Sequence, residues 1–588
     1  MRASNARLSL LFHRLADRLE IAGGTPFQVQ AYHRFADGVA MLAESLYDRW
    51  ETGGALAELP GIGKAIAQKL DSLFRIGTFP LLEKLALEVP ESQLELLRIR
   101  GLGPARVRAL SEQIGVRDID QLRLAMEDGR LDTVKGFGER TGSRIRRSLG
   151  EYLSHRGRRL RHLCDGPMDA LIARLARCPS TVSVLPAGSY RRGIEDVGTL
   201  SLVVPTRHPE EIAACLEALD FAQVIHEPPA DVEMKADSPH PAPVTVRLRF
   251  DTGLAAQVVA CVPEAAGAVL AWFTGSKAHR ERLARIAASR GTTFSPTGLH
   301  SPSGPADTPD EASFYGALGL PYVPPELRED RGELEAALNL RLPRLVERGD
   351  ILGDLHMHTR ASDGTGSVLD MALAARALGH RYIAVTDHTQ NVRIANGLTP
   401  ERADALIDEV RRTDGQVEGI RLLAGLEVDI LKDGSMDMPD ELLARLDVVI
   451  ASVHSHFDQP QEEMTARVLM AMSHPHVHIL AHPTGRLIGQ RSALQLDMDR
   501  VFEAAVSNRV CLELNSNPER LDLNDEHCRM AARLGIPVVI STDAHSPAQL
   551  DNMKRGVVQA RRGWLEPGNV VNTRSCEDAM AVLRRRGG

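Results

Sequence analysis

The fold of the C-terminal region is decided by the stretch DLHMHTRASDG, residues 354–364, where a short apolar segment ends in two histidines and an acidic loop follows. His356 and His358 are two residues apart, so strand alternation would place both imidazoles on one face. Asp363 follows in a Ser-Asp-Gly loop. Histidine and aspartate at the end of a strand are typical of a site at the carboxyl edge of a sheet.

The same arrangement recurs further along the chain, in the segments YIAVTDH, RLLAGLEVD, VVIASVHSH, HILAHP and PVVISTDAH. Strands alternate with helical segments throughout residues 351–588, which predicts parallel βαβ units closed into a barrel. The carboxyl ends of such strands meet at one mouth. We therefore expect nine side chains to converge there: His356, His358, Asp363, His388, Glu427, His454, His482, Asp543 and His545.

This residue set predicts a multinuclear metal site. Imidazole and carboxylate ligands together suit zinc, manganese or iron. Nine ligands are too many for one ion, so we expect two or three divalent ions, Mn²⁺, Zn²⁺ or Fe²⁺. Metal pairs about 3.5–4 Å apart activate water and stabilise both oxygens of a phosphoryl displacement. Any one of these residues alone would more often be an ordinary polar side chain, so the prediction depends on the set.

Four neighbouring residues each have two alternative roles. Asp387, Asp429 and His456 are expected to orient ligands or to be structural. Arg486, in HPTGR, is predicted either to hold a phosphate or to form a structural ion pair. The residues expected to take part in catalysis are His356, His358, Glu427, Asp543, His545 and Arg486.

Length and composition fit a multidomain globular protein. The 588 residues suffice for three or four domains, and 43% of them are hydrophobic and 25% charged. The first helix is amphipathic and no apolar run is long enough for a bilayer, so we expect a cytoplasmic protein without a membrane partner. The seven scattered cysteines suit buried thiols better than disulfides. The net charge of −8 neither requires nor excludes nucleic acid.

A Gly-x-Gly turn between helices occurs three times in the N-terminal region, at Gly61–Gly63, Gly101–Gly103 and Gly136–Gly138. This is the helix-hairpin-helix pattern. Glycines let the backbone approach a surface closely, and the next helix points its free N–H groups at whatever lies there. A single copy would be an ordinary turn, but three copies followed by an arginine-rich stretch predict DNA binding, with Lys64 beside the first turn.

The sequence divides into five segments. Residues 1–85 and 86–160 are predicted to be all-α, and residues 161–322 to be α+β because short strands alternate with helices. A linker is expected at 323–350, beginning Val323-Pro324-Pro325, and the barrel at 351–588.

The C-terminal segment resembles the PHP (polymerase and histidinol phosphatase) phosphoesterases through DLHMHT, SDG, TDH, GLEVD, SVHSHF, AHPTGR and STDAH, in this order. The resemblance implies a distorted (β/α)7 barrel with a trinuclear site. All nine ligand positions named above hold the residue type that the family has there.

The N-terminal part is similar to bacterial family X DNA polymerases, through LPGIGKAIAQKLD, GSYRRG and WFTGSKAHRERLARIA. This implies an N-terminal helix-hairpin-helix (8-kDa-like) domain, a fingers-like region, and a nucleotidyltransferase core with palm and thumb. The family's three catalytic aspartates are replaced by Thr199, Ser201 and Gln257. Neutral groups cannot hold Mg²⁺ pairs, so we expect an inactive polymerase.

Three further interpretations follow from the family. Gly188, Ser189, Arg191 and Arg192 of the GSYRR motif would either contact phosphate or persist as turn structure. Lys69 lies where the family's lyase forms its Schiff base, although an exposed helical lysine is the simpler interpretation. Glu195 and Asp196 lie near the missing aspartates but out of register with them.

The combination predicts a DNA-repair nuclease, a 3′–5′ exonuclease that also incises at abasic sites, acting as a monomer at the bacterial nucleoid on gapped, 3′-ended or abasic DNA. Three alternatives stay open at this point. They are a small-molecule phosphatase like histidinol phosphatase, a non-enzymatic DNA-binding scaffold, and an active polymerase with substitute carboxylates.

Overall fold

The computed structural model describes residues 5–40, 46–58, 62–99, 101–155, 157–217, 219, 221–225 and 242–584. The chain divides into two compact units, residues 1–156 and 157–588. Within the described residues, no helix combines the length and the apolar character that crossing a bilayer would need.

The described residues of the first unit form only helices, which pack around two hydrophobic cores. The helix α4 begins after Gly63. The helix α7 begins with Pro104 and is followed by Gly115, which takes the left-handed conformation (φ 70°). The helices are α1 (Asn5–Ile21), α2 (Pro26–Ala40), α3 (Leu46–Glu51), α4 (Lys64–Ile76), α5 (Pro80–Glu88), α6 (Glu91–Glu95), α7 (Pro104–Ile114), α8 (Ile119–Glu127) and α9 (Glu139–His155).

The second unit begins with the predicted α+β core. Its five-stranded sheet has the order β2-β4-β7-β6-β5, in which β4 and β7 run parallel. The strands are β2 (Leu185–Ala187), β4 (Thr199–Pro205), β5 (Ala222–Ile225), β6 (Val244–Phe250) and β7 (Ala255–Cys261). The principal helices are α10 (Asp165–Leu175), α11 (Gly188–Arg191), α12 (Pro209–Glu217), α13 (Ala266–Thr274), α14 (Lys277–Ser289) and α15 (Glu311–Ala317).

The C-terminal part of this unit is the predicted parallel barrel. Seven strands follow one another in sequence order, and the isolated bridge Met357–Ala544 links the last strand region to the first. The strands are β11 (Gly353–Asp354), β12 (Tyr382–Val385), β13 (Arg421–Asp429), β14 (Val448–Ser452), β15 (Ile479–Leu480), β16 (Cys511–Asn515) and β17 (Val538–Ser541). Nearly every strand residue is buried, as expected when helices cover a parallel sheet.

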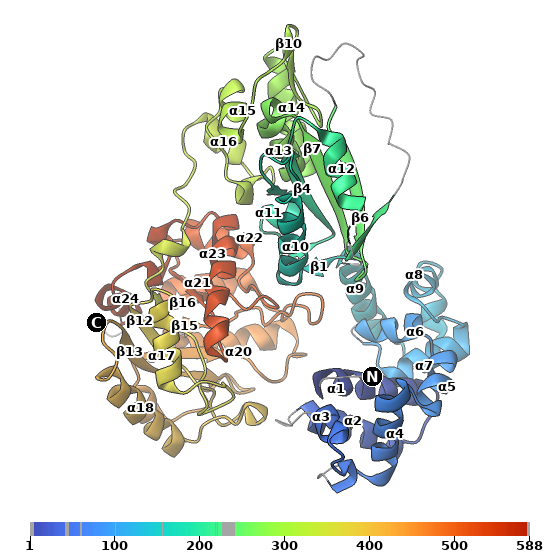
Figure 1. Ribbon diagram of the computed structural model, residues 1–588. Helices are drawn as coiled ribbons and strands as arrows, with labels where there is room; N and C mark the ends of the chain where they lie inside the picture. The colour runs from blue at the N-terminus through green and yellow to red at the C-terminus, as the bar shows by residue number, and fades with distance from the viewer. Residues whose placement is uncertain are drawn as a thin grey trace. The chain divides into compact units, whose positions relative to one another are not determined.

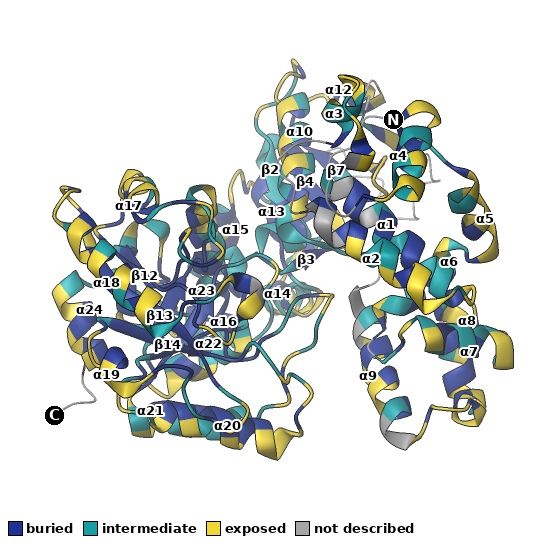
Figure 2. Ribbon diagram, turned by 90° about the horizontal axis from the view of Figure 1, so that it is seen from below, coloured by how far each residue is buried: buried dark blue, intermediate teal, exposed yellow. Residues whose placement is uncertain are grey.

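The barrel's helices lie outside its strands (Figure 1), and Figure 2 shows the strands in the buried colour with exposed residues on the surrounding helices. These helices are α17 (Val368–Ala377), α18 (Pro400–Asp414), α19 (Asp440–Leu443), α20 (Gln461–Ser473), α21 (Met498–Asn508), α22 (Asp525–Arg533), α23 (Met553–Arg562) and α24 (Cys576–Leu583).

Residues 323–350, where a linker is expected, are packed against the α+β region. This segment contains the helix α16 (Glu333–Leu338), and Val323, Leu327 and Leu334 belong to the hydrophobic core of the α+β region. Arg328 is fully buried and bonds to Glu311. The proline pair at its start indicated a linker, but apolar residues and one buried ion pair fasten the segment to the preceding domain.

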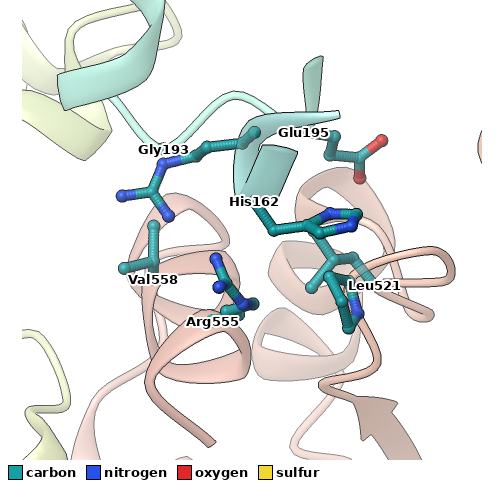
Figure 3. Close-up of a pocket in the computed structure, with 8 residues that line it drawn as sticks. His162, Gly193, Glu195, Leu521, Arg555 and Val558 are labelled. Atoms are coloured by element: carbon teal, nitrogen blue, oxygen red, sulfur yellow. The ribbon is translucent and has the colours of Figure 1, made fainter. Parts of the chain in front are cut away.

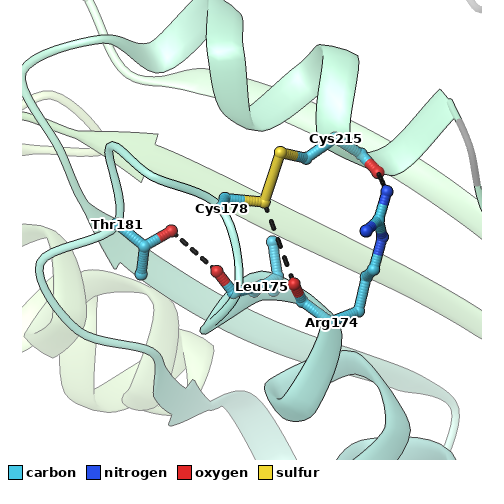
Figure 4. The surroundings of a disulfide bond; sticks show 5 residues. All are labelled: Arg174, Leu175, Cys178, Thr181 and Cys215. Atoms are coloured by element: carbon cyan, nitrogen blue, oxygen red, sulfur yellow. Dashed lines mark hydrogen bonds between the residues drawn. A yellow bond between two sulfur atoms is a disulfide. The ribbon is translucent and has the colours of Figure 1, made fainter.

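The expectation of buried thiols rather than disulfides is wrong for two of the seven cysteines. Cys178, just after α10, and Cys215, on α12, form a disulfide with their Cα atoms 6.3 Å apart (Figure 4). The two residues are separated by 37 positions and belong to no recognisable motif, so the sequence offered no sign of this pairing. Cys164, Cys261 and Cys528 are buried free thiols, and Cys576 is a partly exposed one.

Candidate active site

The nine predicted side chains gather at the carboxyl ends of the barrel strands, with Glu427 at their centre. Glu427 lies on β13, two residues before the strand ends, and is fully buried. Its carboxylate lies 2.8 Å from Nδ1 of His388, 2.9 Å from Nε2 of His482 and 3.3 Å from Nε2 of His454. These imidazoles follow β12, β15 and β14, so one carboxylate meets side chains from three neighbouring strands.

The remaining ligand candidates surround His358. Its Nε2 lies 3.2 Å from Nε2 of His356 and 3.1 Å from Oδ1 of Asp543. On the outer side, Asp363 Oδ2 lies 3.4 Å from Nε2 of His545 and 3.8 Å from Nε2 of His388. The first and last strands of the barrel therefore contribute to the same cluster, as the order of the strands predicts.

The donor set fits divalent cations. Three overlapping groups hold ligand atoms close enough for one ion each: His358, Asp363, His388 and His545; His356, His358 and Asp543; and His388, Glu427 and His454. Nδ1 of His388 and Oε2 of Glu427 are buried and lack a hydrogen bond among the described residues, although they lie 2.8 Å apart. Nitrogen and oxygen lone pairs left in this way are what zinc, manganese or iron would use.

Burial and mutual charge set the protonation of the cluster. Burial would raise the pKa of Glu427, but His454 and His388 outweigh it and hold that pKa well below its usual range. Burial lowers the pKa of His358 to about 3. Burial also acts to lower the pKa of His545, yet Asp363 and Asp543 raise it to about 9. The carboxylates are thus anionic at neutral pH, and a cation would displace the proton of His545.

Of the three residues predicted to orient ligands or to be structural, Asp429 and Asp387 bond beside the cluster, whereas His456 belongs to none of its groups. Asp429 accepts a hydrogen bond from the His454 backbone N–H at 2.9 Å and lies 3.4 Å from its Nδ1. Asp387 accepts from the backbone N–H and hydroxyl of Thr359, each at 2.8 Å, and so holds the loop that leads to Asp363. His456 adopts a positive φ of 53° two residues beyond His454, and it belongs to none of the three groups.

Three residues of the site were not foreseen from the sequence, and all belong to β16 or the loop that follows it. Glu513 lies 2.7 Å from Nδ1 of His356. Asn515 donates to Asp543 at 3.0 Å. Arg520 places its buried Nε, which has no hydrogen bond among the described residues, 3.7 Å from Oδ2 of Asp543. Polar residues at alternating positions of an apolar strand were the available sign for the first two.

Arg486 has the second of its two predicted roles. Its guanidinium donates to both carboxylate oxygens of Glu195 in the α+β core, one of them at 3.1 Å, and to the carbonyl of Leu521. Burial would lower the pKa of Arg486, but Glu195 raises it. The arginine is held in an ion pair and is not directed at the ligand cluster.

The positions of the three missing aspartates also come together. Ser201 on β4 pairs with Gln257 on β7 in register, and Gln257 Nε2 donates to Ser201 Oγ at 2.9 Å. Thr199 lies two residues before Ser201 on the same strand and is exposed. Among the described residues, the single metal-capable group of this core is His208, Glu210 and Glu211, which is fully exposed and joins none of these positions.

The GSYRR motif is committed to internal bonds. Gly188 has φ 66°, and a Cβ there would lie 2.9 Å from Ser201 Oγ. Arg191 donates to both oxygens of Glu311, at 2.9 and 2.7 Å. Arg192 donates to Glu329 at 2.8 Å, while Ser189 accepts from the Ile194 N–H through its carbonyl. These bonds match the turn-structure interpretation of the motif.

The helix-hairpin-helix glycines lie at helix starts where the structure describes them; Gly61 is outside the described residues. Gly101 and Gly136 have φ of 95° and 93°, and Gly63, Gly103 and Gly138 have open space where a Cβ would be. Lys64 opens α4 and is exposed. Lys69 lies on α4 with its ammonium 5.7 Å from the Tyr32 ring centroid, and it donates to the Ala65 carbonyl.

Family models match four parts of the chain. They describe a helix-hairpin-helix domain at residues 3–79, a SAM-like helix-hairpin-helix tandem at 94–151, a DNA polymerase beta thumb at 269–329 and a PHP domain at 354–517.

Curated relatives fall into two kinds. Proteins described as probable phosphatases match about a third of this chain. One from Acetivibrio thermocellus is 33% identical over 34% of this chain and 83% of its own length. One from Syntrophotalea carbinolica is 29% identical over 39% of this chain and 95% of its own length. The DNA polymerase/3′-5′ exonuclease PolX of Bacillus subtilis is 37% identical over 583 residues, 98% of both chains. Because this similarity extends over nearly the full length of both proteins, this chain belongs to the bacterial PolX family.

Proposed function

We propose that this protein is a metal-dependent 3′–5′ exonuclease of DNA repair that also incises at abasic sites, and that its polymerase core no longer extends primers. The observation that carries the proposal is the convergence of His356, Glu427, Asp543 and their neighbours on one buried cluster. In the polymerase core, by contrast, the positions of the family's three catalytic aspartates hold the neutral residues Thr199, Ser201 and Gln257.

The proposed ligands are the nine residues of the cluster. Two or three divalent cations held by them would supply Lewis acidity toward water and phosphate oxygens. Glu513 and Asn515 orient His356 and Asp543. Arg520 would donate to a non-bridging oxygen of the scissile phosphate, because its buried Nε has no other hydrogen bond among the described residues.

The remaining parts have proposed roles as well. The exposed helix starts at Lys64, Gly103 and Gly138 would bind the DNA backbone independently of sequence. The proposed domains are residues 1–85, 86–160, 161–322 and 351–588, with 323–350 as a packed connection. We place the protein in the cytoplasm at the nucleoid, as a monomer on gapped, 3′-ended or abasic DNA.

The test is a nuclease assay on single-stranded, gapped and abasic DNA with Mn²⁺, in the presence and absence of deoxynucleotides. The wild type should shorten 3′ ends and add no nucleotide. His356→Ala and Asp543→Ala should each lower the rate at least about 1,000-fold and leave DNA affinity unchanged, because each removes a metal ligand. His474→Ala, which removes an imidazole outside the cluster, is the control. Full activity in both ligand variants would refute the proposal, and primer extension would refute its second part.

A small-molecule phosphatase is the second candidate, because relatives described as phosphatases match part of the chain. Turnover of p-nitrophenyl phosphate compared with that of a labelled oligonucleotide separates the two. The exonuclease proposal requires the higher kcat/KM on the oligonucleotide.

A further inference from the structure

Two loops beside the ligand cluster are bonded to each other. The first, residues 482–486, carries the ligand candidate His482, and the second, residues 517–523, follows β16. The Thr484 N–H donates to Asp522 at 3.0 Å, and the Arg486 guanidinium donates to the carbonyl of Leu521. The two loops are therefore hydrogen-bonded to each other at two points.

The second loop needs outside support. Leu521 has φ 42°, a left-handed conformation that a residue with a side chain keeps only where its surroundings impose it. The residue before it is Arg520, whose Nε lies 3.7 Å from Oδ2 of Asp543. The hydrogen bond from Arg486 to the Leu521 carbonyl thus fixes the residue that follows Arg520. Arg520 is the one basic residue of this loop.

Arg486 is held in turn by a residue from the polymerase core. Glu195 lies between α11 and β3 (Asp196–Val197), 291 positions before Arg486. Its carboxylate accepts hydrogen bonds from both terminal nitrogens of Arg486, and also one from the Gln559 side-chain amide at 2.9 Å. The side chains of Arg486 and Glu195 are only 16% and 22% exposed, so water screens this pair weakly.

Figure 3 shows a small cavity beside Glu195, which is also lined by His162, Leu521, Arg555 and Val558. The cavity joins the polymerase core to α23 and to the 517–523 loop. Glu195 thus bonds to the first loop through Arg486 and lines the same cavity as Pro518 and Leu521 of the second loop, although it belongs to another domain.

We propose that Glu195 of the polymerase core is a positioning residue of the phosphoesterase site. Through Arg486 and Leu521 it holds Arg520 where the scissile phosphate would bind, an inference that depends on the function proposed above. The core that has lost its own carboxylates therefore still contributes to hydrolysis, as a fixed support for the mouth of the barrel.

The first experiment compares Glu195→Gln with Asp165→Asn in the full-length protein. Asp165 is a matched control, because it also joins the core to α23, accepting from Arg555 at 2.8 Å, but contacts neither loop. Glu195→Gln should lower kcat on a 3′-labelled oligonucleotide between about 10- and 100-fold, the usual range for groups that orient a site, with KM, metal content and Tm unchanged. Asp165→Asn should keep the wild-type kcat.

The second experiment is a double-mutant cycle with Arg520→Ala. If Glu195 acts through Arg520, Glu195→Gln has no further effect on kcat in the Arg520→Ala protein, whereas a purely structural role gives the same fold-loss in both backgrounds. A wild-type kcat in Glu195→Gln, or additive losses, would overturn the inference while leaving the nuclease intact. If the wild type cuts only p-nitrophenyl phosphate, the nuclease proposal fails, and the same cycle on that substrate still decides the role of Glu195.

Discussion

At the scale of single residues, Glu513 shows how a side chain that binds no ion can shape the site. It is fully buried on β16, and its two oxygens meet different parts of the cluster. One lies 2.7 Å from Nδ1 of His356, and the other accepts the His482 backbone N–H at 2.6 Å. A carboxylate at Nδ1 fixes the proton there and leaves Nε2 free for a cation.

Glu513→Gln should therefore weaken metal binding without unfolding the barrel. The amide keeps the shape of the side chain but offers one acceptor oxygen where two are needed, so either His356 or His482 loses its partner. We expect the Mn²⁺ concentration at half-maximal activity to rise between about 10- and 100-fold. Glu519→Gln, an exposed change on the following loop, should leave it unaltered. Equal Mn²⁺ requirements for the two variants would contradict this account.

At the scale of secondary-structure elements, one buried ion network holds the thumb region together. Glu311, in the first turn of α15, accepts hydrogen bonds from Arg191 of α11 and from Arg328. Arg328 is fully buried and also donates to the Val323 carbonyl at 2.9 Å. Burial acts to raise the pKa of Glu311, but Arg328 and Arg191 lower it below its ordinary value of 4.5.

This network predicts a pH-dependent stability. Because the folded pKa of Glu311 is depressed, its contribution is complete above about 4.5 and is lost as the pH falls through the lower folded value. Glu311→Gln leaves Arg328 as an unpaired buried charge and should cost about 3–5 kcal/mol of unfolding free energy near neutral pH. Urea unfolding followed by circular dichroism should show that the difference in unfolding free energy between the wild type and Glu311→Gln shrinks as the pH falls through the folded pKa of Glu311. The exposed Glu281→Gln should change stability little at any pH, and a pH-independent loss for Glu311→Gln would disprove the assignment.

The elements also show what a sequence can and cannot reveal. The barrel strands were predictable because parallel strands covered on both sides are short apolar runs, and the cluster because His356, His388 and Asp543 each stand at the end of such a run. The pairing of Glu195 with Arg486, which are 291 residues apart, could not be predicted from the sequence. It depends on how two domains pack, which leaves no local pattern in the chain.

At the scale of the whole molecule, the proposed function assigns two tasks to the two compact units. Residues 1–156 carry all three Gly-x-Gly turns and have hydrophobic cores of their own. Residues 157–588 carry the nine ligand candidates together with Glu195, Glu513 and Arg520. Contact with the DNA backbone away from the cut and hydrolysis of the phosphodiester are thus assigned to different stretches of chain.

A protein consisting of residues 157–588 should therefore keep the chemistry and lose affinity. Its kcat on a short 3′-labelled oligonucleotide should stay near that of the full chain, because every residue of the cluster and of its support is present. Its KM on long gapped DNA should rise about tenfold or more at physiological salt, and the salt dependence of binding should become shallower, since fewer phosphates are contacted. The full chain with Lys64→Glu should shift KM in the same direction by less. Unchanged KM and salt dependence in the shortened protein would show that the second unit binds DNA by itself, and that the glycine turns of the first unit are no more than helix connections.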